Sequence, residues 1–273
     1  MRKWVDEAMG GAGVVLIALC LVFLIVPLVV SLVMSFDARS FLGRFPPPDF
    51  SLQWYERFLG DATYTRSLGN SLMLAVTAAT FSVLFGLAAG IGIDRTRFPG
   101  RDVLLALFLS PLIVPGVVIG FSLLLLLAWF GIIDGFTRLV LGHLVITFPY
   151  VVRATLASLV GIGRSLDEAA MSLGADEWWV IWTVTLPLCR TGAVVGALFA
   201  FAISIDDVAV GIFLADPDSY TLPLTLVTMM RANFDLTIAA ASAFLVALAV
   251  LLILVVELFI GVDRVIGHGM FRS

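Results

Sequence analysis

Six apolar runs, each long enough to cross a lipid bilayer, constrain this chain more than any other feature. A helix needs roughly 20 apolar residues to span about 30 Å of hydrocarbon. To within a few residues, the runs lie at 13–35, 70–92, 103–130, 139–160, 192–214 and 236–260. Because 61% of the 273 residues are hydrophobic and only 13% are charged, a water-soluble globule of this size would leave much of that surface exposed.

The runs predict helices, because lipid offers no partner to unpaired backbone groups and the runs are too long for barrel strands. We therefore expect an all-α polytopic membrane protein with six transmembrane helices in a single transmembrane domain over residues 1–273. Arg2 and Lys3 precede the first run, as in a signal peptide. Its apolar core exceeds the usual length of about 7 to 15 residues, which favours a retained span.

Positive charge outside the runs sets the expected orientation. With the N-terminus inside the cell, the cytoplasmic segments carry nine Lys and Arg residues and the outer segments carry six. The compact cluster of Arg95, Arg97 and Arg101 is the strongest local signal. We expect a multi-pass protein of the bacterial cytoplasmic (inner) membrane, embedded in the lipid bilayer, with both termini in the cytoplasm.

What the sequence lacks disfavours several function classes. Lys3 is the only lysine, so the chain has no GxxxxGK phosphate-binding loop, and any ATP must bind another protein. With only His143 and His268, a metal or haem centre is hard to build. No Ser, His and Asp set presents itself for catalysis, although sequence does not report spatial neighbours. We expect no cofactor, metal or catalytic residue and, for want of a basic run, no nucleic acid partner.

The segment 161–190, between the fourth and fifth runs, differs from every other loop. Ser165 is a predicted N-cap with Glu168 at the capping-box spacing, and Gly174 supplies a helix stop. A second amphipathic piece follows from Asp176. The pattern predicts a short helix, a sharp glycine corner and a second helix.

The spacing within this segment is long and specific. It reads Glu168-Ala169-Ala170, three residues, Gly174, nine residues, Val184, one residue, Leu186-Pro187. This resembles the EAA signature of ABC importer permeases, which has Ile where Val184 stands. The resemblance implies the type I, MetI-like permease fold and a coupling helix that seats in a cytoplasmic ATPase. The ATPase-coupling residues it implies are Glu168, Ala169, Ala170, Leu173, Gly174 and Ala175.

A membrane-surface hairpin is the alternative for this segment. Interfacial helices usually carry Lys or Arg on their polar face, and this one is acidic.

The resemblance further implies that the chain is a transport subunit and not an enzyme. Its implied partners are a cytoplasmic ABC ATPase dimer, a second, homologous permease subunit, and a periplasmic or extracellular substrate-binding protein.

Two adjacent carboxylates, Asp206 and Asp207, lie within the fifth run. A carboxylate in hydrocarbon costs several kcal/mol unless it faces protein or water, which suggests a translocation pathway that also includes Ser204. The stretch 199–208 and the stretch 221–224 are similar to the spermidine/putrescine branch of these permeases, which implies a polyamine cargo. Alternatively, the two carboxylates cap a helix break or bond to neighbouring helices.

Pro111 and Pro115 interrupt the third run, so its helix should kink or break there. Transporters place such breaks at hinges, although a static, packed kink is equally consistent.

Three other functions stay open. They are the same scaffold with another solute (an amino acid, opine or metal chelate), an ion-coupled secondary transporter that uses Asp206 and Asp207, and an integral membrane enzyme.

Overall fold

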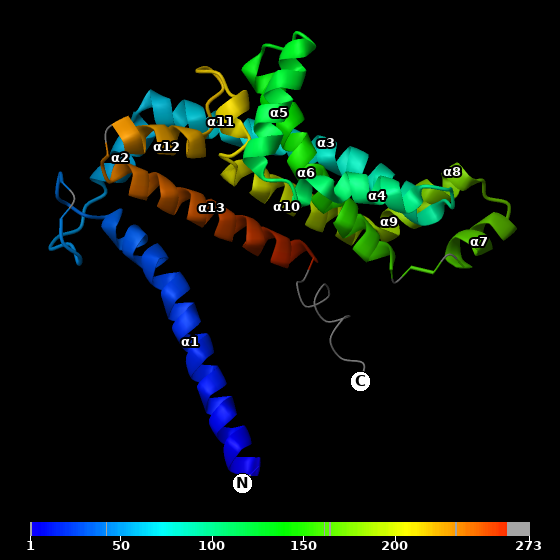
Figure 1. Ribbon diagram of the computed structural model, residues 1–273, viewed down its shortest axis with the longest axis horizontal. Coiled ribbons are helices and arrows are strands. Elements are labelled where there is room, and N and C mark those ends of the chain that lie inside the picture. The colour runs from blue at the N-terminus through cyan, green and yellow to red at the C-terminus, as the bar shows by residue number, and fades with distance from the viewer. Residues whose placement is uncertain (1, 42, 161, 164, 233, 261–273) are drawn as a thin grey trace. The chain divides into compact units, whose positions relative to one another are not determined.

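The computed structural model describes residues 2–41, 43–160, 162–163, 165–232 and 234–260. Within these residues, every regular element is a helix (Figure 1). The chain divides into two compact units. The smaller unit takes the residues up to 65 together with 228–248, and the larger takes 66–227 together with the residues from 249 onward.

The smaller unit is built around α1 (Arg2–Met34) and the short helix α2 (Gln53–Gly60). Its core consists of Met34, Trp54, Leu236 and Ala240. The Trp54 indole N–H donates to the carbonyl oxygen of Asp37 at 2.8 Å, which satisfies the polar edge of a buried ring.

The larger unit holds most of the other helices. They are α3 (Ala62–Arg95, which begins in the smaller unit), α4 (Arg101–Leu109), the 3₁₀ turn η1 (Ser110–Leu112), α5 (Gly116–Trp129), α6 (Gly135–Leu159), α7 (Ser165–Ser172), α8 (Glu177–Val180), the π-helix η2 (Ile181–Thr185), α9 (Leu186–Leu188), α10 (Arg190–Asp206) and α11 (Gly211–Leu214). Two further helices cross between the units, α12 (Leu222–Ala232) and α13 (Thr237–Ile260).

Helices α6 and α10 form the centre of the larger unit and pack closely along each other. Glycines on α10 make this approach possible. A Cβ added at Gly192 would lie 2.7 Å from the carbonyl oxygen of Ala154, and one at Gly196 would lie 3.0 Å from the Cα of Val151. Small residues at such crossings let two backbones meet, which is how helices associate without a hydrophobic driving force in lipid.

Among the residues that the structure describes, four helical stretches are long and apolar enough to cross a membrane, or up to six if each of two bent pairs counts as one span. The four correspond to the first, second, fourth and sixth predicted runs. The third run is a pair bent by 105°, and the fifth begins in a pair bent by 66°. Six spans therefore fit the structure only when the bent pairs are counted.

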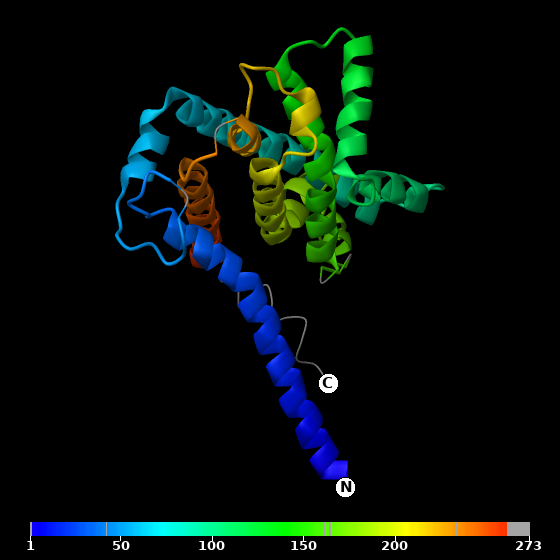
Figure 2. The same ribbon diagram turned by 60° about the vertical axis from the view of Figure 1, so that its left-hand side comes forward.

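The third run breaks where the prolines predicted a kink. Helix α4 ends at Leu109, η1 contains Pro111, and Pro115 is the N-cap of α5. Proline lacks the backbone N–H that an α-helix needs, so the ladder stops and restarts in a new direction. Figure 2 shows α5 leaving this break at a steep angle to α4.

The segment between the fifth and sixth predicted runs is partly helical. It contains α12, whose first turns are buried at Leu222 and Leu226. Serines of α3 receive this helix. The Leu222 N–H donates to the Ser71 hydroxyl at 2.8 Å, and the hydroxyls of Ser67 and Thr225 hydrogen-bond to each other at 2.7 Å.

Candidate functional site

The predicted corner at Gly174 is confirmed. Helix α7 ends at Ser172, and Gly174 has a φ of +94°, in the left-handed region. The Gly174 N–H donates to the carbonyl of Met171 at 2.9 Å, and the Ala175 N–H donates to that of Ala170 at 3.2 Å. These two bonds form a Schellman motif, which closes a helix with a glycine. At the other end, α7 begins at Ser165 itself.

Exposure divides the EAA signature into two halves. Ala170 and Ala175 are half-buried within the corner, so their small side chains hold the turn together. Glu168 and Ala169 are exposed, and Leu173 is 90% exposed. The three exposed residues can therefore contact a partner protein. The two half-buried alanines shape the corner on which those residues lie.

The second limb of the hairpin starts as predicted after Asp176. Its carboxylate accepts a hydrogen bond from the Trp179 N–H at 2.7 Å and so caps α8. The limb then passes through η2 and α9 before the 66° bend that leads into α10. Trp178 and Trp182, one helical turn apart, are both exposed.

An ion pair braces the hairpin from behind. Asp167 is buried on α7, and its Oδ2 lies 3.0 Å from Nε of Arg95, the last residue of α3. Its Oδ1 accepts a hydrogen bond from Thr185 of the second limb at 3.3 Å. Sequence alone did not identify Asp167, because its partners are distant in the chain and only the fold brings them together.

The fifth run is interrupted at the acidic pair. Helix α10 ends at Asp206, and the Oδ2 of Asp207 accepts hydrogen bonds from the N–H groups of Val210 and Gly211, both at 3.0 Å. Asp207 therefore caps the break, in agreement with the capping alternative. The Asp206 residue is exposed. The lining role of Asp206 stays a prediction.

Ser204, the third predicted pathway residue, is buried near the end of α10. Its hydroxyl lies 2.7 Å from Nδ1 of His143 on α6.

Arg153, also on α6, is a cation that the charge count omitted because it falls inside the fourth run. Its side chain is exposed within a helix long enough to span a bilayer.

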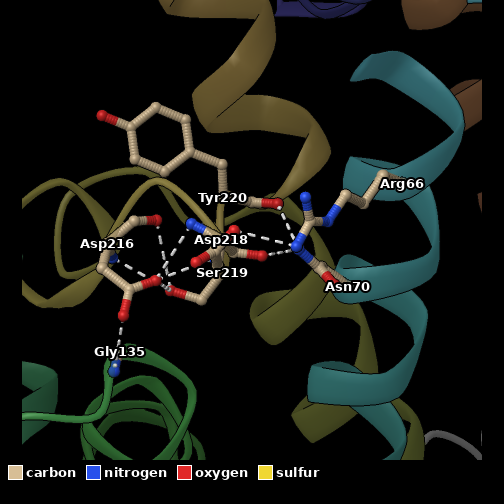
Figure 3. Close-up of polar contacts among 7 residues, drawn as sticks. All are labelled: Arg66, Asn70, Gly135, Asp216, Asp218, Ser219 and Tyr220. Atoms are coloured by element: carbon tan, nitrogen blue, oxygen red, sulfur yellow. Dashed lines mark hydrogen bonds and ion pairs between the residues drawn. The ribbon is translucent and has the colours of Figure 1, made fainter. Parts of the chain in front are cut away.

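The loop before α12 is fastened to α3 (Figure 3). Asn70 donates through its side-chain amide to the carbonyl oxygens of Asp218 and Tyr220 at 2.9 and 3.0 Å. Arg66 pairs with the Asp218 carboxylate at 2.9 Å, but both side chains are well exposed, so this pair contributes little. The amide bonds of Asn70 therefore set the position of the loop.

The same loop also reaches the start of α6 (Figure 3). Asp216 accepts a hydrogen bond from the Gly135 N–H at 2.9 Å and another from the Ser219 hydroxyl at 2.7 Å. The Ser219 hydroxyl and these backbone donors lower the pKa of the Asp216 carboxyl, because they stabilise its charged form. Nothing in the sequence pattern identified this link between the loop and α6.

Several helices of this length and hydrophobicity define a polytopic membrane protein. Residues 82–264 match the family described as the inner membrane component of binding-protein-dependent transport systems, and the chain belongs to this family. It is thus the permease subunit of an ABC importer, and the predicted all-α, MetI-like fold is confirmed.

Individual relatives agree with this assignment. The chain is 28% identical to the spermidine/putrescine transport system permease protein PotC of Shigella flexneri, over 90% of this chain and 92% of that protein. It is 32% identical to the molybdenum transport system permease protein ModB of Escherichia coli K12, over 71% and 92%. A solved bacterial ABC transporter involved in alginate import has a similar fold, with a TM-score of 0.75, 17% identity and coverage of 93% and 97%.

Proposed function

We propose that this permease imports a polyamine such as spermidine or putrescine, passing it between itself and a second, homologous permease. The resemblance to PotC over most of both chains supports this cargo. The carboxylate of Asp206, an exposed residue at the end of α10, would lower the barrier for a polycation in a water-filled pathway. An external binding protein delivers the cargo.

The coupling mechanism rests on one observation. The exposed residues of the EAA signature lie on a glycine corner that an ion pair holds in place. Glu168, Ala169 and Leu173 form a surface that a cytoplasmic ATPase dimer can seat. The ion pair between Asp167 and Arg95 joins that surface to the end of α3. A push on the hairpin is therefore passed to a long helix as a rigid-body shift.

This mechanism places the hairpin and both termini in the cytoplasm. The arginines that follow α3, at 97 and 101, agree with that orientation under the positive-inside rule. The loop of Figure 3 then faces outward, where a binding protein docks. We assign the bend between α4 and α5, at Pro111 and Pro115, as a hinge of alternating access.

Uptake by reconstituted transporter tests this function. The permease pair, ATPase and binding protein are placed in liposomes, and labelled spermidine uptake is measured with and without ATP. We expect ATP-dependent uptake that falls at least tenfold in Asp206→Asn, with ATP hydrolysis retained. Uptake that is driven by an ion gradient and indifferent to ATP would reject the importer mechanism in favour of secondary transport.

An anionic solute is the second candidate cargo, because Arg153 is exposed within α6 and ModB is a relative. A cation inside a spanning helix must face protein or water, where it would attract an anion. The two candidates predict opposite effects of charge removal. Arg153→Gln should abolish oxyanion uptake if the cargo is anionic, and should preserve or raise spermidine uptake if the cargo is a polyamine.

A further inference from the structure

Behind the acidic pair lies a buried histidine to which the transport mechanism has so far given no role. His143 of α6 is fully buried. Its Nδ1 lies 2.7 Å from the Ser204 hydroxyl, in the last turn of α10. Its Nε2 has no hydrogen-bond partner within the described part of the chain, and lies 3.8 Å from Oδ2 of Asp207.

The position of the ring is well fixed. The Thr147 hydroxyl donates to the carbonyl oxygen of His143 at 2.6 Å and hydrogen-bonds to Ser82 of α3, also at 2.6 Å. Helix α6 packs along α10. With the backbone held in this way and the ring held by Ser204 at Nδ1, the gap at Nε2 closes through a shift of Asp207.

An unsatisfied, buried ring nitrogen is unusual, because buried polar groups in native proteins nearly always find a partner. Asp207 instead directs its Oδ2 to the N–H groups of Val210 and Gly211. A hydrogen bond to Nε2 requires about 2.9 Å, so an approach of roughly 1 Å would form one. The carboxylate thus has a second partner within reach of a small shift.

We propose that His143 is the positioning residue of the break between α10 and α11. Its Nδ1 holds the end of α10 through Ser204. Its Nε2–H donates to the Asp207 carboxylate when that carboxylate leaves the N–H groups of the break, while Nδ1 accepts from the Ser204 hydroxyl. The exchange re-aims the neighbouring residue, Asp206, between two directions during the transport cycle. This role depends on the permease function and holds for either cargo.

Two substitutions separate the two nitrogens of the ring. The amide of Asn reaches the position of Nδ1, whereas the longer Gln reaches that of Nε2. We expect His143→Gln to keep uptake per ATP hydrolysed within about threefold of wild type, and His143→Asn to lower it at least tenfold. Thr155→Val is the matched control, since it removes a buried hydroxyl hydrogen bond on the same helix about three turns away from His143 and should leave uptake per ATP unchanged.

Normal uptake per ATP in His143→Asn would overturn the proposal. An equal loss of uptake per ATP in both variants would also overturn it. Should the Asn variant fail to assemble, hydrogen exchange in the wild-type complex decides. The amides of Val210 and Gly211 must lose protection in one nucleotide state, because Asp207 leaves them. Equal protection in the nucleotide-free and ATP-trapped complexes would refute the exchange.

Discussion

Replacing Gly174 by alanine isolates the contribution of the hairpin corner. A left-handed conformation costs an L-residue about 1–2 kcal/mol. A Cβ at Gly174 would meet none of the described atoms within 4 Å, so the penalty comes from the backbone alone. It acts on the two Schellman bonds, one between Gly174 and Met171 and the other between Ala175 and Ala170. A penalty of this size lowers the population of the closed corner by a factor of about 5–30.

Gly131 provides the matched control. It has a φ of +74° in the turn between α5 and α6, and its added Cβ would also have no neighbour within 4 Å among the described residues. Both alanine variants should therefore lower the melting temperature by similar amounts. In proteoliposomes with the ATPase, only Gly174→Ala should lower uptake per ATP hydrolysed, by several-fold.

Two outcomes would refute this reasoning. Normal uptake per ATP in Gly174→Ala would show that the corner does not transmit force. An equal loss in Gly131→Ala would show that both variants act through general instability. The hydrolysis rate of the ATPase without permease gives the baseline. In an uncoupled variant, adding cargo should change the hydrolysis rate as little as it does for the free ATPase.

Three further predictions concern the brace, the loop and the bend. Asp167→Asn leaves Arg95 with Asp94, 3.4 Å away, as its remaining carboxylate neighbour, so the cost stays below about 3–5 kcal/mol; the change should speed hydrogen exchange in α7, and unchanged exchange would contradict the brace. Because the pKa of Asp216 is lowered, its contribution is present above about pH 4 and lost as the pH falls through that lowered pKa. The Gly135 amide should then lose protection in acid, and constant protection would argue against the link. Pro111→Ala should slow uptake without impairing assembly if the bend is a hinge, and an unchanged rate would favour a static kink.

The sequence predicted those helices, turns and breaks whose positions depend on neighbouring residues in the chain and not on tertiary contacts. Long apolar runs identified the spanning helices, because bilayer thickness fixes their length. Gly174 and Asp176 marked the hairpin, because a left-handed corner and an N-cap have residue preferences that do not depend on the rest of the fold. The proline break was visible for the same reason.

The remaining features depend on tertiary contacts. Sequence placed Asp206 and Asp207 in the membrane, but the direction of each carboxylate depends on where α10 ends. His143 gained its partner only when α6 packed on α10. The brace of α7 and the buried start of α12 likewise join segments far apart in the chain. No local pattern encodes such pairings.

Chemical cross-linking at Leu173 tests the central claim that this hairpin receives the ATPase. Leu173→Cys and a control, Ile133→Cys, are made in a chain whose Cys20 and Cys189 are replaced by serine; the two target side chains are 90% and 79% exposed. A maleimide-linked benzophenone attached to Leu173→Cys should, on irradiation, join it to the ATPase in the purified complex, to an extent that changes with nucleotide. It should not join Ile133→Cys. Cross-linking at Ile133→Cys alone, or at neither position, would contradict the account.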